Sequence, residues 1–203
     1  KGSRPMSATA SGFVPGSGAG AMVLESLDSA LSRGAKIYAE VLGGHVNSGG
    51  QRGSGTMTAP NSESVQRCIT AALKNAGVEA TEVDVIAAHL TATAKDALEI
   101  ENWTLALNRS DSDFPYINSL KSLTGHCISA AGSIECVASV LQIYQSFIFP
   151  NINCEDLNPE ISNLIDASKI PQVMIEKDIN ILAKANFGFG DVNACIIFKK
   201  YTN

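Results

Sequence analysis

INSLKSLTGH, residues 117–126, places a lysine and a histidine on a tight turn between two regular elements. Tyr116–Ser119 has the pattern of a short strand, Lys121–His126 forms the turn, and Cys127–Phe147 is predicted to be a helix. The first turns of that helix carry unusually small side chains. We therefore expect it to lie close to another backbone and to be buried on most sides.

The same strand, turn and helix order occurs once earlier in the chain. Val83–Ala88 is a compact apolar strand, His89 follows it, and Asp96–Asn108 is predicted to be a helix. His89 and His126 are 126 − 89 = 37 positions apart, and each follows a strand and precedes a helix. Open α/β sheets bind ligands at the carboxyl ends of their strands. Two adjacent parallel strands would therefore bring the two imidazoles together.

Local signals predict the elements before this pair. Residues 12–25 look like a loop feeding a buried strand at 21–24, with closely spaced glycines that favour close backbone approach over a phosphate cradle. Ser26–Arg33 is a short helix candidate and Lys36–Leu42 a strand. Gly43–Pro60 has no hydrophobic period and is long for a connection, which favours a functional loop with hydroxyl donors in its TMTAP segment.

Three further segments complete the chain. A helix capped by Asn61 or Ser62 and closed by Gly77 has apolar residues at helical spacing. Pro150–Pro171 is polar and punctuated by prolines, which indicates a surface crossing. Two final β runs, Ile179–Ala185 and Ala194–Phe198, flank a glycine-bearing loop, so we expect a hairpin.

Composition limits the class of protein. The 203 residues are 45% hydrophobic and 17% charged, an ordinary globular balance with enough apolar side chains for a sizeable core. The net charge of −5, with no basic cluster longer than Lys199-Lys200, argues against binding nucleic acid or a membrane surface. Apolar runs fall well short of the roughly 18 residues that a bilayer span needs, and the start lacks a signal-peptide core. We expect a soluble, cytoplasmic protein.

The five cysteines are scattered without CxxC spacing, which supports neither a disulfide framework nor a zinc site. We expect buried, reduced thiols. They are Cys68, Cys127, Cys136, Cys154 and Cys195.

Chemistry centres on the histidine pair. No carboxylate flanks either residue, and no third ligand stands at metal spacing, so neutral imidazoles that donate hydrogen bonds to a developing oxyanion fit better than a metal site. A lone histidine is more often a core residue, but two at equivalent positions, one preceded by Lys121, favour function. Phe187–Gly190 is equally consistent with a hairpin turn carrying core aromatics. Glu135 is either a capping or surface carboxylate, or a buried group that needs a partner.

Four motifs together resemble a known family. HLTAT at 89–93, KSLTGH at 121–126, AAGSIE at 130–135 and NFGFGDVN at 186–193 are similar to the HGTGT or HGTST, KSxxGH, GAAGxxE and NxFGFGGxN patterns of β-ketoacyl-[acyl carrier protein] synthases, type II. GFVPGSGAGAMVLE, RGAKIYAEVLG and TMTAP extend the resemblance in the family's order over nearly the whole chain.

The resemblance implies an α/β, thiolase-like fold with α-β-α-β-α layers, built from two similar halves. Residues 1–45 would be the last strands and helix of the N-terminal half, and residues 46–203 the whole C-terminal half. The family's nucleophilic cysteine stands in a TACSxG-like motif, and none of the five cysteines has that context. We therefore expect these residues alone to be inactive.

The resemblance also assigns roles in a decarboxylative condensation. His89 and His126 would hydrogen-bond the malonyl thioester carbonyl and stabilise the enolate, and Lys121 would orient the site. Glu135 would hold the supporting network. Phe189 would gate the acyl pocket, and its backbone N–H would help form the oxyanion hole.

Substrate contacts follow in the same way. Thr91 and Thr93 would bind the phosphopantetheine arm, and Thr58, Phe187 and Gly188 would contribute to substrate binding. The implied partners are acyl carrier protein, malonyl and acyl thioesters, and a second subunit in a homodimer or heterodimer. No cofactor is implied beyond the phosphopantetheine of the carrier protein.

Several positions depart from the family patterns. Leu90, Ala92, Ala94 and Asp191 replace the family's small residues or proline, at places that would touch the pantetheine tunnel and the gating loop. The alternative function is a non-catalytic, chain-length-factor-like partner of a ketosynthase, although such subunits usually lose catalytic residues. A thiolase would need a CxGxG-like cysteine, and a third-type condensing enzyme an asparagine in place of His126.

Overall fold

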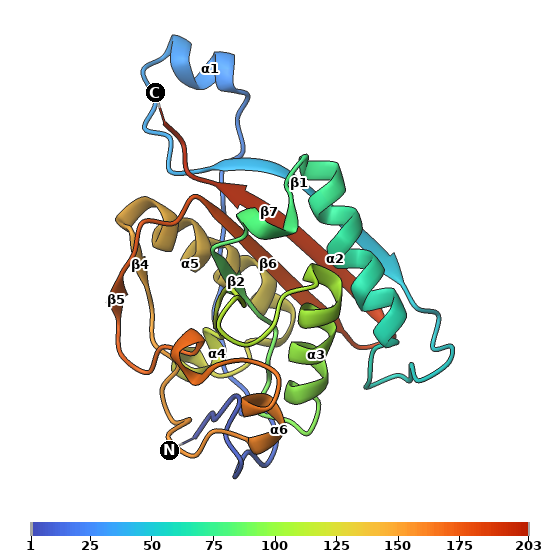
Figure 1. Ribbon diagram of the computed structural model, residues 1–203. Helices are drawn as coiled ribbons and strands as arrows, with labels where there is room; N and C mark the ends of the chain where they lie inside the picture. The colour runs from blue at the N-terminus through green and yellow to red at the C-terminus, as the bar shows by residue number, and fades with distance from the viewer. Residues whose placement is uncertain (1, 203) are drawn as a thin grey trace.

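A five-stranded mixed sheet runs through the centre of the structure, a computed structural model that describes residues 2–202 (Figure 1). The strand order is β1-β7-β6-β2-β3. β2 lies parallel to both of its neighbours, whereas β7 is antiparallel to β1 and β6. The strands are β1 (Glu40–Ser48), β2 (Val85–Ala87), β3 (Tyr116–Asn118), β6 (Ile181–Gly188) and β7 (Val192–Lys199).

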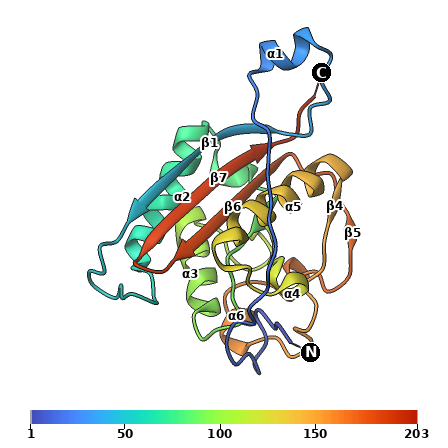
Figure 2. The same ribbon diagram turned by 180° about the vertical axis from the view of Figure 1, so that it is seen from behind.

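Helices cover both faces of this sheet. α2 (Ser62–Ala76) and α3 (Asp96–Leu107) pack on one face, and α5 (Ala131–Gln145) packs on the other, which is seen from behind in Figure 2. The termini of α2 are as predicted, because the Asn61 side chain accepts from the Ser64 N–H and Gly77 ends the helix with a left-handed φ of 66°. The arrangement is a three-layer helix, sheet and helix stack.

Short elements complete the chain. They are α1 (Leu27–Ser32), α4 (Lys121–Thr124), α6 (Pro159–Ser162), the two-residue strands β4 (Phe147–Ile148) and β5 (Ile175–Glu176), and 3-10 turns at Ala80–Glu82, Ile128–Ala130 and Ala167–Lys169. Among residues 2–202, no helix combines the length and apolar character that crossing a bilayer requires.

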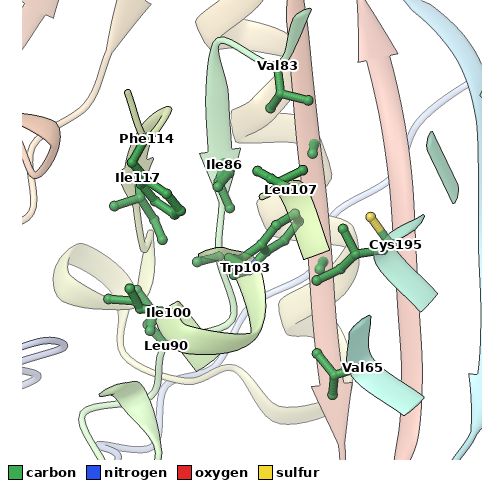
Figure 3. Close-up of a cluster of buried hydrophobic side chains, with 14 of the residues drawn as sticks. Val65, Val83, Ile86, Leu90, Ile100, Trp103, Leu107, Phe114, Ile117 and Cys195 are labelled. Carbon is green, nitrogen blue, oxygen red and sulfur yellow. The ribbon is translucent and has the colours of Figure 1, made fainter. Parts of the chain in front are cut away.

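The core divides between the two faces of the sheet because successive strand residues point to opposite sides. Ile86 of β2 belongs to the larger cluster beneath α2 and α3, which also holds the fully buried Trp103 (Figure 3). Its neighbour Val85 and Leu182 of β6 pack with Ile143 of α5 on the other face. Burying each such side chain stabilises the fold by about 1.5–3 kcal/mol.

The predicted buried strand at 21–24 is wrong. These residues belong to no helix or sheet, and Val23 is 92% exposed. An apolar run forms a strand only where another strand offers hydrogen-bonding partners, and no described segment pairs with this one. The following helix is present as α1. The strand predicted at Lys36–Leu42 lies instead at Glu40–Ser48, where β7 provides a partner along the strand with one register shift between Val41 and Gly43. The predicted loop therefore begins at Gly49.

Two predictions about burial need correction. The crossing at 150–171 is not confined to the surface, because Ile161, Ile165 and Ile170 are buried in the larger core cluster. α5 is buried along one face and half-exposed elsewhere, rather than enclosed on most sides, and Leu141 and Tyr144 reach solvent.

Other expectations from the sequence are confirmed. β6 and β7 form the predicted hairpin. The glycines at 16 and 20 permit close approach: a Cβ on Gly16 would collide with the Thr124 carbonyl, and one on Gly20 would lie 2.6 Å from the Ile134 nitrogen. All five cysteines are free thiols, and all except the half-buried Cys136 are buried.

Candidate active site

Parallel strands bring the two predicted histidines together. β2 ends at Ala87 and β3 at Asn118, in register with each other, so the segments that follow them leave the sheet at the same edge. The rings of His89 and His126 have centroids 5.4 Å apart and are nearly perpendicular, at 85°. The predicted proximity is confirmed, while the catalytic roles stay predictions.

Two carboxylates of α3 shape the backbone around His89. Glu99 accepts from the N–H groups of His89 and Leu90, both at 2.7 Å. Burial, together with the smaller effect of the neighbouring Asp96, raises the pKa of Glu99 to about 7 against the opposing effect of these hydrogen bonds. Sequence reasoning missed this support, because an acidic residue in the first turn of a helix is ordinary.

Asp96 holds the next part of the same loop. Its carboxylate accepts from the N–H groups of Thr91, Ala92 and Thr93 at 3.0–3.2 Å. Ala92 has a φ of 62°, a left-handed conformation that costs a residue with a Cβ roughly 1–2 kcal/mol. The hydrogen bonds to Asp96 therefore stabilise the turn at Ala92, a position where the family pattern has glycine or serine. The hydroxyls of Thr91 and Thr93 lie 3.2 Å apart on this turn.

A buried ion cluster lies behind His89. Glu135, on the buried face of α5, is 4% exposed and pairs with Lys121 through Oε1. Its Oε2 lies 2.7 Å from the Lys184 ammonium and accepts from Asn186 Nδ2 at 2.9 Å. Burial alone would raise the pKa of Glu135, but the two ammonium groups bring it down to about 2. The interpretation of Glu135 as a capping or surface carboxylate is wrong.

Hydrogen bonding fixes the tautomer of His89. Asn186 must present its amide nitrogen to Glu135, because a carboxylate only accepts. The same nitrogen lies 3.1 Å from His89 Nδ1, and the Lys121 ammonium lies 3.4 Å from that atom. Two donors therefore face Nδ1, so this nitrogen accepts and Nε2 carries the hydrogen.

A different hydrogen bond holds His126 in the same tautomer. Its Nδ1 accepts from the Ile128 N–H at 3.1 Å, which again leaves the hydrogen on Nε2. Its backbone is held by the N-terminal segment, because the His126 N–H donates to the Val14 carbonyl and the His126 carbonyl accepts from Gly16. Burial, followed by the nearby Lys121 ammonium, lowers the pKa of His126. Burial and the same ammonium also lower the pKa of His89. Both imidazoles are therefore neutral near pH 7.

The hairpin between β6 and β7 carries the predicted aromatic residues. Phe187 is buried, with its ring centroid 6.3 Å from that of His89, whereas Phe189 is 65% exposed at the turn. The interpretation as core aromatics thus holds for Phe187 and fails for Phe189. Gly188 is exposed between them.

A loop at residues 49–61 lies against this turn. Met57 accepts from the Gly190 N–H at 2.9 Å, and the neighbouring Thr58 is exposed. The buried Asp191 carboxylate accepts from the N–H groups of Gln51 at 3.0 Å and Asn61 at 2.8 Å. Asp191 therefore joins the loop that carries Thr58 to the turn that carries Phe189.

Burial disfavours the thiolate form at four of the five cysteines, Cys68, Cys136, Cys154 and Cys195. Burial raises the pKa of Cys68 and Cys154 to about 11 and that of Cys195 beyond the usual range. A raised pKa disfavours the thiolate that acts as a nucleophile. Within residues 2–202, no group of three His, Cys, Asp or Glu side chains has the arrangement of a metal site.

Residues 38–155 match the family model described as "Beta-ketoacyl synthase, C-terminal domain". This chain belongs to the β-ketoacyl synthase family. It is 40% identical over 202 residues to 3-oxoacyl-[acyl-carrier-protein] synthase 2 of Rhizobium meliloti (strain 1021), covering 100% of this chain and 46% of that protein. It is 37% identical to the chloroplastic 3-oxoacyl-[acyl-carrier-protein] synthase I of Arabidopsis thaliana, covering 98% of this chain and 41% of that protein.

Solved structures agree with this membership. The ishigamide ketosynthase/chain length factor matches with a TM-score of 0.90 at 35% identity, covering 100% of this chain and 48% of that one. A type II PKS acyl-carrier protein in complex with its ketosynthase bound to the hexaketide matches at 0.84 and 32% identity, covering 98% and 47%. The predicted ketosynthase-like α/β fold class is confirmed, and the chain spans about half the length of the relatives that it matches.

Proposed function

We propose that this chain is the C-terminal portion of a ketosynthase that condenses a malonyl thioester with an acyl thioester and releases carbon dioxide. The observation that carries the proposal is the pair of adjacent neutral imidazoles, His89 and His126, each with Nδ1 occupied as an acceptor and Nε2–H left as a donor. Two such donors suit a carbonyl oxygen that becomes negatively charged.

The malonyl thioester carbonyl accepts hydrogen bonds from both Nε2–H groups, and the bond to the carboxylate carbon breaks as carbon dioxide leaves. The electron pair of that bond forms an enolate, whose oxygen the two histidines stabilise. The enolate carbon then attacks an acyl thioester carried on a cysteine outside these residues, and that cysteine leaves as a thiolate. Lys121 and Asn186 keep His89 in the tautomer that donates.

Further contacts of the substrate belong to the same proposal. Thr91 and Thr93, on the turn held by Asp96, bind the phosphopantetheine arm, and Thr58 approaches it from the loop joined to the hairpin. Phe189 gates the acyl pocket, which its exposed position at the hairpin turn supports. Phe187 and Gly188 shape the pocket beside it.

The proposal extends to assembly and location. The thioesters arrive on acyl carrier protein, and residues 1–45 and 46–203 belong to successive halves of a subunit that forms a dimer. A cytoplasmic location stays a prediction, since the relatives include chloroplastic and putative mitochondrial synthases. Without the nucleophilic cysteine, residues 1–203 alone carry out no condensation.

A second candidate is a chain-length-factor-like subunit that shapes an acyl tunnel for an active ketosynthase. It is favoured by the match to a ketosynthase/chain length factor and by the changed residues Ala92 and Asp191. The sequence upstream of Lys1 separates the two candidates, because a cysteine in a TACSxG-like setting supports the enzyme and a replacement there supports the partner.

Assaying the full-length protein with malonyl and acyl thioesters of acyl carrier protein tests the first candidate. Replacing one oxyanion donor costs about 100- to 1,000-fold in rate, so His126→Ala is expected to lose condensation by that factor. Lys74→Met, on the exposed face of α2, is the control and keeps the wild-type rate. Condensation at the normal rate by His126→Ala would rule the enzyme proposal out.

A further inference from the structure

A lysine without an assigned role lies in the middle of the sheet. Lys184 of β6 is paired in register with Ala87 of β2 and Ile196 of β7, and it is 1% exposed. Its ammonium contacts Glu135 Oε2 and donates to the Ala185 carbonyl. Replacing a buried ion pair with apolar side chains is often neutral or stabilising, so stability alone does not explain a lysine here.

Two ammonium groups, Lys121 and Lys184, contact the single carboxylate of Glu135, and Glu99 is a further acidic group that acts on Lys121. Lys121 alone would neutralise the carboxylate. The attraction of Lys184 is nevertheless the largest influence that lowers the pKa of Glu135, ahead of that of Lys121. The second ammonium therefore adds positive charge to a site where, in the proposed reaction, negative charge develops.

The hydrogen bonds of Glu135 connect Lys184 to His89. Lys184 and Asn186, two positions apart on the same face of β6, both donate to Oε2, while Lys121 holds Oε1. Asn186 donates one amide hydrogen to Oε2, and the same nitrogen then lies within hydrogen-bonding distance of His89 Nδ1. Without Lys184, the carboxylate keeps one strong partner on Oε1 and can turn toward Lys121, which releases Asn186.

We propose that Lys184 is a positioning residue of the two-histidine site, which fixes the Glu135 carboxylate so that Asn186 holds His89 with its hydrogen on Nε2. The proposal deepens the proposed function and rests on it for its catalytic meaning. Lys184 acts through Glu135 and Asn186 and does not touch the substrate.

The test uses the full-length protein with ¹⁵N-labelled histidine, comparing wild type with Lys184→Met and the control Lys74→Met. The nitrogen resonances of His89, assigned by their loss in His89→Ala, report its tautomer and its titration. Wild type and the control are expected to show one tautomer with hydrogen on Nε2. Lys184→Met should show a mixture with a larger share of the Nδ1–H form, because only the longer 3.4 Å contact from Lys121 still faces Nδ1. Removing this cation also raises the pKa of His89, because the Lys184 charge is one of those that lower it; the other titratable groups near His89 are Lys121, His126, Glu135 and Glu99.

Malonyl decarboxylation provides the second readout. Misplacing a reacting group by about 1 Å can cost about 100-fold in rate, so Lys184→Met should lose kcat by about 10- to 100-fold and move the acid limb of its pH profile upward. Lys184→Gln keeps a hydrogen-bond donor for Oε2 but lacks the charge. The pH profile of decarboxylation is measured with this variant if the methionine variant does not fold.

The two proposals fail in different ways. A wild-type tautomer and pH profile in Lys184→Met or Lys184→Gln would overturn the positioning role, even where the rate falls. Absence of decarboxylation in the wild-type protein would overturn the proposed function, whereas a tautomer mixture in Lys184→Met would still support Lys184 as the residue that positions His89.

Discussion

Asp191 is expected to control whether the loop at residues 49–61 stays on the β6–β7 turn. Its carboxylate accepts from the Gln51 and Asn61 N–H groups, and each hydrogen bond to a charged group contributes about 1.5–3 kcal/mol. Asp191→Gly removes both bonds, a loss of about 3 kcal/mol at the lower bound. Glycine also adopts the left-handed φ of 62° without the steric cost of a side chain, which restores about 1 kcal/mol of stability. The net loss of loop stability is about 2 kcal/mol.

Limited proteolysis measures this loss directly, because the loop carries a trypsin site after the exposed Arg52. When opening is fast relative to cleavage, the rate follows the open population, so about 2 kcal/mol corresponds to roughly 30-fold faster cleavage after Arg52. Cleavage after Arg67, inside α2, serves as an internal control and should not change. Asp178→Ala, which removes an exposed carboxylate elsewhere, should behave as wild type. Equal cleavage after Arg52 in Asp191→Gly and wild type would show that Asp191 does not hold the loop on the turn.

Further predictions concern close packing and pH. Gly20→Val should destabilise the protein by about 1–3 kcal/mol, because the new side chain meets the backbone of α5 at Ile134. Gly132→Ala should be neutral or stabilising. Denaturant unfolding measures the stability of both variants. The pKa of Glu135 is lowered to about 2. Its contribution to stability is therefore complete above pH 4.5 and disappears as the pH falls toward 2. Glu135→Gln should remove this pH dependence from the unfolding free energy. Glu99 has the opposite effect on the pH dependence of stability. Its pKa is raised to about 7, so the unfolding free energy falls as the pH rises from 4.5 to 7. Glu99→Gln should flatten this slope of unfolding free energy against pH. An unchanged slope would contradict the assignment.

The pairing of His89 with His126 could be predicted from sequence because it depends on local patterns and one topological rule. Each histidine follows an apolar run and precedes a helix, and adjacent parallel strands end at the same edge of a sheet. α2 could be predicted equally well, since its apolar period and both caps lie within one segment. Such features need no knowledge of distant contacts.

The supporting residues could not be found in the same way. Lys184 and Asn186 lie in a run that reads as a strand, and their role depends on facing Glu135 of α5, some fifty residues earlier in the chain. A lysine inside an apolar strand was the available signal, because a buried ammonium requires a partner. The strand expected at 21–24 failed for the converse reason, since its apolar residues meet no neighbouring strand among those described.

Release of carbon dioxide from malonyl-acyl carrier protein by the full-length protein isolates the step assigned to the two histidines. We expect His89→Ala and His126→Ala each to slow this release by about 100- to 1,000-fold. The double variant should be little slower than the worse single variant, because groups that act as a unit are not additive. Release at the wild-type rate by either single variant would contradict the claim that the two Nε2–H groups stabilise the enolate.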